Sequence, residues 1–266
     1  MSVWDVYKAR ADTRGMTKRE TTLKREIRTI NHRLPDSLSY QTVTLYTGEH
    51  GYNIESDEAK TNAITQNVAI INSDNLNEKT IISFPEEDLE NGSLVYWMDN
   101  YWLITERDAN TTVYTKAKMI QCNHLLHWVS ADNEVIEQWC IVEDGTKYLT
   151  GEYEDRNFVV TRGDSRISVT IARNKETVRL DRTNRFIIDD VDSPSPLAYA
   201  LTKPLKLGSV YNKTGVFKFV LQEVVRTVND IADEGIADYY QHFVDSSPEP
   251  QEPKPVDNEG RKKVWL

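Results

Sequence analysis

The sequence predicts a mainly β protein, built from a β-barrel or sandwich domain and a second β-sandwich-like unit, with an N-terminal helical arm. Three observations support this. Residues 92–129 form the densest block of strand-forming residues. Similar short runs, separated by turn-forming residues, recur at intervals of roughly ten residues, which is typical of barrels and sandwiches. The clearest helical spacing lies in the first 35 residues.

These differences in composition and residue spacing divide the chain into four parts. The turn-rich stretches and changes of composition place the boundaries near residues 35, 150 and 245. The predicted organisation is a basic helical arm, a β-barrel domain, a second β domain and a proline-rich extended tail, at residues 1–35, 36–150, 151–245 and 246–266.

The arm contains one predicted helix of about four turns. Thr17 followed by Glu20 fits a capping box, which satisfies backbone N–H groups at a helix start. Apolar residues then recur at helical spacing, at Leu23, Ile27 and Ile30. Leu34-Pro35 ends this pattern. The stripe is too narrow for a helix buried all round. We therefore expect the helix to pack by one side and to show its arginines on the other.

Charge is unevenly distributed along the chain. Residues 1–33 carry nine Lys and Arg against four acidic residues, a balance of +5, whereas the whole chain carries −10 and the remainder therefore −15. A basic arm on an acidic body fits binding to nucleic acid or to an acidic face of a protein partner. A solvated helix explains the same pattern, so the charge alone leaves these readings open.

The first β domain is centred on a predicted hairpin and antiparallel meander. Leu94–Trp97 and Tyr101–Thr105 are joined by a short polar connection, Met98-Asp99-Asn100. Connections this short join only antiparallel neighbours. The other predicted strands of this domain are 41–46, 68–71, 79–84, 113–115, 125–129, 135–142 and 147–149.

In the second β unit, short strand-forming runs are again separated by turn-forming residues. Its predicted strands are 157–161, 165–171, 186–188, 197–207 and 216–225, with a turn at Arg162-Gly163-Asp164. A short helical or irregular segment at 229–240 closes the unit. The tail ends in an apolar tip, Val264-Trp265-Leu266, which is either a frayed end or a docking peptide for a neighbouring surface.

Residue types that bind metals lie close together at Cys122, His124 and His127, with Cys140 farther on. Their spacing is not a standard zinc pattern, and His124 and His127 would not share a face of a regular strand. We interpret them as ordinary strand residues with free thiols, and predict no metal and no cofactor.

Aromatic residues gather in the same region, at Tyr96, Trp97, Tyr101, Trp102, Trp128 and Trp139. They resemble a base-stacking platform, but the neighbouring strands are not basic. We interpret them as cross-strand core pairs.

No catalytic motif and no membrane-spanning or signal segment stands out in the sequence. We searched for a phosphate-binding glycine loop, a nucleophile elbow, an HExxH pair and a Ser/His/Asp set. The five histidines lie outside any such context. The sequence therefore favours a protein that is not an enzyme and that acts by assembling with others.

Two stretches carry a resemblance to a known family. The run from NSDNLNEKTIISF to QCNHLLHW, and later RFIIDD, AYALTKPLKLGSVYNKTGVFKFVLQEVV and GIADYY, resemble the neck proteins of tailed bacteriophages, in particular those of Firmicutes hosts. The resemblance covers roughly residues 60–240. It lies in the general character of the sequence rather than in a signature motif. It implies a small β-barrel of the head-completion or stopper kind, followed by a second, sandwich-like domain.

The resemblance also implies a role. Such a subunit forms a homo-oligomeric ring in the head-tail connector, between the portal protein and the tail or adjacent neck proteins, in a virion assembled in the host cytoplasm. It retains and conducts double-stranded DNA without sequence-specific binding, and an acidic lumen would let the duplex slide. Arg19, Arg25 and Arg28 would face the portal or a neighbouring subunit, and Trp265 would be a further partner-binding residue. The alternatives are another virion structural protein, of the tail, baseplate or capsid, and a nucleic-acid-binding protein.

Overall fold

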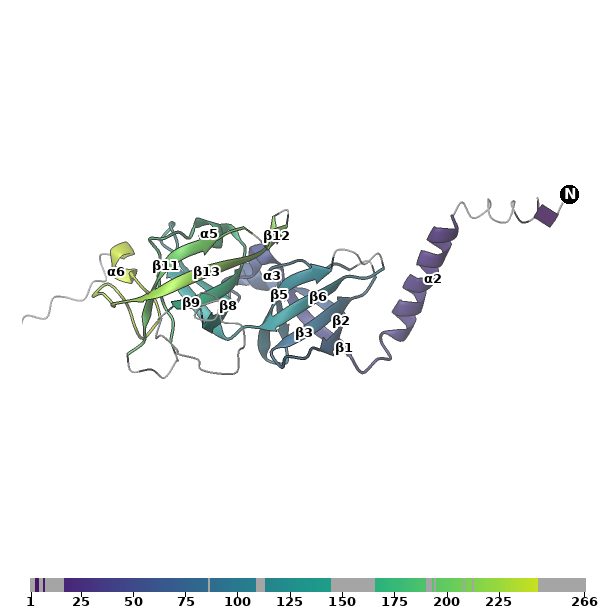
Figure 1. Cartoon of the computed structure of the whole chain (residues 1–266), viewed down its shortest axis with the longest axis horizontal. Coiled ribbons are helices and arrows are strands. Elements are labelled where there is room, and N and C mark those ends of the chain that lie inside the picture. Colours follow the sequence, from purple (N-terminus) through teal and green to yellow (C-terminus); the bar gives the residue numbers. More distant parts are fainter. Residues whose placement is uncertain are drawn as a thin grey trace, which may run out of the picture.

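A computed structural model describes residues 3–4, 7, 17–85, 87–108, 113–144, 166–189, 193, 195–207, 209–211 and 213–243. The described chain is mainly β, with two barrel-like sheets and an N-terminal helix, so the predicted fold class is confirmed. Figure 1 shows an elongated molecule in which the helix α2 lies at one end and the short helix α6 at the other.

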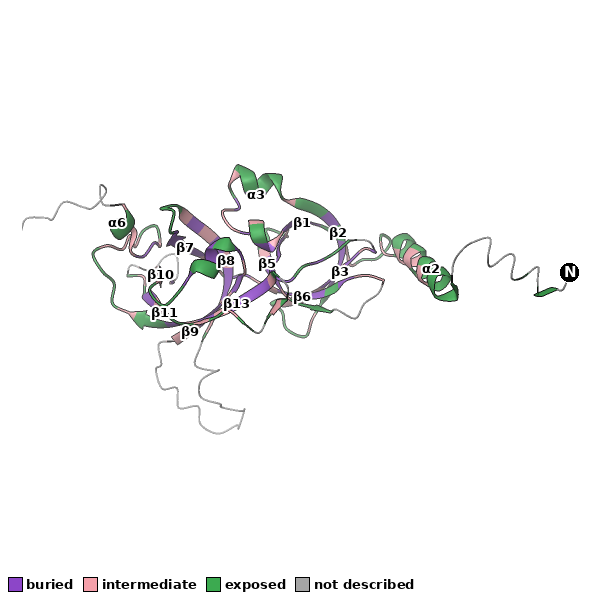
Figure 2. Ribbon diagram, turned by 90° about the horizontal axis from the view of Figure 1, so that it is seen from above, coloured by how far each residue is buried: buried purple, intermediate pink, exposed green. Residues whose placement is uncertain are grey.

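Helix α2 spans Lys18–Arg33 and begins with the predicted capping box. The Thr17 N–H donates to Glu20 Oε2 at 2.7 Å, and the Glu20 N–H donates to Thr17 Oγ1 at 3.3 Å. No residue of α2 is buried, and the helix stands clear of the barrel in both views (Figures 1 and 2). The described part of the chain therefore does not bury either side of this helix, and the expectation that it packs by one side stays a prediction.

The first unit is a closed antiparallel barrel with strand order β1-β2-β3-β6-β5-β4. Alternating residues of these strands point inward and form its core, which includes Val68, Ile81, Ile104 and Met119. Because the barrel is closed, each of its six strands has a neighbour on both sides. Its strands are Tyr40–Tyr46, Ile64–Asn72, Glu78–Ser83, Leu94–Trp97, Asn100–Asp108 and Lys116–Gln121, for β1 to β6 in order.

The predicted central hairpin is confirmed, with a loop one residue shorter than expected. Trp97 pairs with Asn100, so only Met98 and Asp99 lie in the turn. Both have positive φ, 48° and 57°. A two-residue turn of this kind matches the right-handed twist of the flanking strands. The Asn100 side chain donates to the Met98 carbonyl at 2.7 Å and supports the turn.

The meander does not continue as predicted. Strand β6 lies at Lys116–Gln121 rather than at 113–115, and β7 (His124–Val129) and β8 (Val135–Asp144) belong to the second sheet. The chain crosses between the sheets within two residues, because the Cys122 N–H donates to the Tyr101 carbonyl and the Asn123 N–H to that of Cys140. The two sheets therefore divide at residues 122–123, whereas the sequence predicts a boundary near residue 150.

The second sheet has the order β10-β11-β13-β9-β8-β7, with β12 paired to β13. Its end strands β7 and β10 lie side by side, so the sheet curls into a second barrel-like form. A core that includes Phe186, Phe219 and Leu126 fills it. The remaining strands are Arg166–Ala172, Arg185–Ile187, Ala198–Leu205, Val210–Tyr211 and Thr214–Val224, for β9 to β13.

Short helical segments complete the described chain. They are η1 (Gly48–His50), α3 (Asp57–Thr61), α5 (Lys175–Arg179) and α6 (Tyr239–His242). The predicted closing segment is thus irregular, with one turn of helix at its end. Several sequence predictions lie outside the described residues: the strands at 147–149 and 157–161, the Arg162-Gly163-Asp164 turn, the tail at 246–266 and its Trp265.

The two units pack against each other through a third core cluster. It joins Leu94 and Leu103 of the barrel to Ile141, Ala172 and Val216 of the second sheet. The Tyr101 and Trp139 rings stack across this junction with centroids 4.8 Å apart.

Backbone hydrogen bonds also connect the two units. The Asn53 N–H donates to the Glu137 carbonyl at 2.7 Å, and the Glu137 N–H donates to Asn53 Oδ1 at 2.7 Å. Asn53, a loop residue of the first unit, is therefore bound to β8 of the second through its backbone N–H and its side-chain oxygen.

Candidate functional site

The three arginines singled out in the sequence are all exposed on α2. At 3.6 residues per turn, Arg25 and Arg28 lie roughly opposite the apolar stripe of Leu23, Ile27 and Ile30. Arg19 precedes Leu23 by one turn and lies at the edge of the stripe. The structure therefore brings Arg25 and Arg28 together on one side and places Arg19 apart from them.

The apolar stripe of α2 is itself a candidate surface. Leu23, Ile27 and Ile30 are only half-buried, and no residue of α2 is buried. Isolated helices of this length are marginal in water, and most helical stability comes from packing an amphipathic face. This helix thus offers an apolar side and a basic side to whatever lies beside it.

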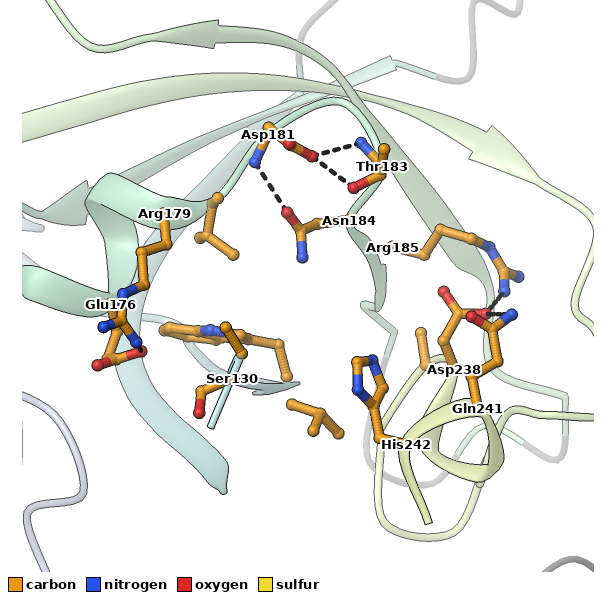
Figure 3. Close-up of a pocket in the computed structure, with 15 residues that line it drawn as sticks. Ser130, Glu176, Arg179, Asp181, Thr183, Asn184, Arg185, Asp238, Gln241 and His242 are labelled. Carbon is orange, nitrogen blue, oxygen red and sulfur yellow. Dashed lines mark hydrogen bonds and ion pairs between the residues drawn. The ribbon is translucent and has the colours of Figure 1, made fainter. Parts of the chain in front are cut away.

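A cleft of about 360 Å³ lies in the second unit (Figure 3). The loop after β7, α5, the segment 181–185 and α6 surround it, and Trp128 and Leu180 line it. Most of its charged groups are already paired. Arg179 Nη1 lies 2.7 Å from Asp132 Oδ2 and 3.6 Å from Glu176 Oε2.

Arg185 forms the most buried charge cluster of the described chain, at the edge of this cleft. Its guanidinium contacts Asp230 at 3.0 Å and also Asp238, and the side chains of Arg185 and Asp230 are 15% and 1% exposed. Burial raises the pKa of Asp230, but hydrogen bonds from the Asp238 and Thr227 N–H groups and from Arg185 outweigh this and hold the pKa below its ordinary value. The cluster fastens the segment before α6 to β10.

The hydroxyl groups that line the cleft support its loops. Ser130 Oγ accepts from the N–H groups of Asp132 and Glu134, at 3.1 and 3.4 Å. The Thr183 hydroxyl and N–H both donate to the Asp181 carboxylate. These bonds hold the loops that shape the cleft.

The cysteines and histidines of the sequence prediction lie near the start of β7 and on β8. Cys122 and Cys140 are buried free thiols, and burial raises the pKa of both. His124 pairs in register with Cys140, whereas His127 lies beside Glu137, with Nε2 and Oε1 3.7 Å apart. Within the described part of the chain, no group of three or more His, Cys, Asp or Glu side chains is placed to hold a metal ion.

The aromatic residues form cross-strand pairs, as predicted, and the Tyr101–Trp139 pair in addition joins the two sheets. Tyr96 pairs with Tyr101, and Trp97 contacts Trp102, at centroid distances of 5.0 and 5.7 Å. Trp128 packs edge-on against Phe186 in the core of the second sheet. Their faces are therefore largely used in packing.

Sequence reasoning missed the Arg185 cluster and the residues of the junction. Arg185 and Asp230 are 45 residues apart, and no local pattern links them. Gly92 and Gly215 meet across the two units so closely that a Cβ on Gly92 would lie 2.1 Å from the Gly215 carbonyl oxygen. The one local signal in the sequence is the glycine itself, which can adopt the positive φ of 84° found at Gly92.

Among the described residues, no helix has the length and apolarity needed to cross a membrane.

The fold and surfaces define a mainly β protein with an exposed, basic, amphipathic arm. Comparison with family models adds one match: residues 22–121 are similar to the YomX N-terminal domain, a phage-derived family. The matched segment includes most of α2 and ends with the last residue of β6, so it covers the closed barrel. The chain therefore carries a phage-related domain. Searches of curated proteins and of solved structures returned no match.

Proposed function

We propose that this protein is a structural subunit of a tailed-phage virion, which forms a ring in the head-tail connector between the portal and the tail. In this role it acts through surfaces and catalyses no reaction. Its ring retains the DNA and conducts it through an acidic lumen without sequence-specific contacts. The phage-related domain supports a phage origin of the protein, and its two β units support a role in assembly.

The observation that carries the proposal is the exposed arm. Helix α2 has no buried residue, and its apolar stripe is left uncovered by the described chain. Exposed apolar surface bordered by charge is typical of protein interaction sites. The arm and α6 lie at opposite ends of the long axis (Figure 1), so one subunit can contact different partners at its two ends, as a connector must.

Charge reversal on the arm tests this proposal. The triple variant Arg19→Glu, Arg25→Glu, Arg28→Glu should abolish incorporation into particles while leaving the isolated subunit folded, because all three side chains are exposed. The matched control reverses three exposed cations of the body, Lys116, Arg182 and Lys203, and should assemble normally. Normal assembly of the arm variant would refute the assignment.

Two measurements separate the proposal from its alternatives. Antibody labelling of purified particles should place the protein at the neck; labelling of the tail, baseplate or capsid would favour another virion role. In a gel-shift experiment at moderate salt, little DNA binding is expected. Tight binding that weakens steeply with salt would instead identify a nucleic-acid-binding protein.

A further inference from the structure

A groove of about 640 Å³ follows the seam where the two end strands of the second sheet meet. Residues of β7, β8 and β10 form its floor together with Pro196, and Ser193 and residues 232–235 form its walls. Leu125 and Trp139, which face each other across β7 and β8, provide apolar surface together with Pro196. We call it the seam groove.

The seam groove is acidic. Asp189, Asp233 and Glu234 line it, and none of the described residues lining it is a lysine or arginine. Its two histidines do not offset this charge, because burial lowers the pKa of both His124 and His127 and keeps them neutral at pH 7. An apolar floor with an acidic rim suits a ligand that combines apolar and cationic groups.

One polar group of the groove also lacks a partner among the described residues. The His124 ring hydrogen-bonds the Ile187 backbone, while its Nε2 is buried and has no hydrogen-bond partner within the described part of the chain. In a neutral imidazole that donates through one nitrogen, the other is an acceptor. Buried acceptors are rarely left unsatisfied in folded proteins.

The chain itself contains a segment with the complementary chemistry. Residues 261–266 read Arg-Lys-Lys-Val-Trp-Leu, three cations followed by three apolar residues, and lie outside the described residues. The described chain leaves the second unit at Phe243, directly after α6, which packs beside β7. The intervening residues 244–260 can span at most about 60 Å, so the groove beside their starting point is within reach.

We propose that residues 261–266 dock into the seam groove of the same copy. Val264, Trp265 and Leu266 cover the apolar floor of Leu125, Trp139 and Pro196, and the three preceding cations face the acidic rim. Tethering favours this over capture from another copy, because a linker of this length gives an effective concentration on the order of millimolar. The inference concerns how the chain covers its own groove and does not depend on the virion role.

A peptide-binding experiment tests the proposal. A fluorescein-labelled peptide of residues 257–266 is titrated into the full chain and into a chain ending at Gly260. The shortened chain should bind the peptide saturably, and the full chain at least tenfold more weakly, because its groove is already occupied. Equal binding by the two chains, or no binding by the shortened one, would overturn the proposal.

Charge exchange then tests the site. Asp233→Lys with Glu234→Lys in the shortened chain should weaken binding at least tenfold, and a peptide with Lys262→Glu and Lys263→Glu should restore it. Both groove positions are exposed, so the variant should keep the circular dichroism and thermal midpoint of its parent. The matched control, Asp57→Lys with Glu58→Lys, should bind the original peptide normally. Failure of the exchanged charges to restore binding would contradict the assigned contacts.

Two further outcomes identify a different occupant and would also overturn the proposal. If dilution of the full chain uncovers peptide binding, the groove is filled by a second copy. If Leu23→Asp with Ile27→Asp uncovers it instead, the occupant is the apolar stripe of α2.

Discussion

Arg185 is the residue whose charge the fold depends on most directly. It faces Asp230 and Asp238, and Asp230 is 1% exposed. Removing one member of a buried ion pair leaves an uncompensated charge, which costs about 3–5 kcal/mol. Arg185→Met should therefore lower the free energy of unfolding by about 3 kcal/mol, measured by urea denaturation.

The matched control is Arg107→Met. Arg107 also pairs with an aspartate, Asp88, but the two side chains are 39% and 54% exposed. Exposed ion pairs contribute at most about 1 kcal/mol, so this variant should change stability little. Equal losses in the two variants would contradict the importance given to burial.

His124 should make the stability of the protein depend on pH. Burial lowers its pKa in the folded state, so the unfolded chain binds the proton more readily. Stability is then complete above the unfolded pKa of about 6.5 and is lost as the pH falls from there through the lower folded value.

Urea midpoints measured between pH 7.5 and 5.5 test this effect. The midpoint of the native protein should fall with pH, and His124→Gln should reduce that slope. Burial also lowers the pKa of His127, so the His124 variant should retain part of the pH dependence. An unchanged slope in the His124 variant would show that the ring is not desolvated as described.

At the scale of elements, close approach of two backbones joins the barrel to β13. Gly92, with φ of 84°, approaches the Gly215 carbonyl so closely that a Cβ would lie 2.1 Å away. Gly92→Ala combines the cost of a left-handed conformation with a steric clash, roughly 3 kcal/mol in total. We expect this loss in the free energy of unfolding.

Gly51→Ala is the control for the effect of replacing a glycine. A Cβ there would meet its nearest atom at 3.4 Å, an ordinary contact, and no positive φ is required. Its stability should stay within about 0.5 kcal/mol of the native protein. A comparable loss at Gly51 would mean that the Gly92 contact has no special role.

The elements that could be predicted from sequence are those defined by neighbouring residues. The capping box of α2 and the β4–β5 hairpin depend on residues a few positions apart, and both are confirmed. The composition of β7 and β8 identifies them as strands but does not show to which sheet they belong. That assignment depends on Cys122 and Asn123, whose backbone bonds to opposite sheets carry no sequence signal.

The candidate surfaces were predictable in part, for the same reason. The arginines of α2 follow from local composition, and their exposure is confirmed. That the described part of the chain leaves the stripe of Leu23 and Ile27 unburied was not predictable, because it depends on where the barrel lies. The seam groove combines residues 123–139, 187–196 and 232–235, which only the closed second sheet brings together.

For the whole molecule, the junction determines whether the two units unfold together. A shared apolar cluster, the Tyr101–Trp139 stack and the paired bonds of Asn53 with Glu137 all cross it. Each unit therefore covers apolar surface that the other would expose if it unfolded alone. We expect a single cooperative transition, with equal calorimetric and van 't Hoff enthalpies.

Asn53→Gly tests this coupling without straining the backbone, since Asn53 has a φ of 45° that glycine accepts. The variant keeps the backbone bond to Glu137 but removes the side-chain acceptor of the Glu137 N–H, at a cost of about 1–3 kcal/mol. Hydrogen exchange should then show a parallel loss of protection in β5 and in β13. Loss confined to one sheet would mean that the two units unfold independently.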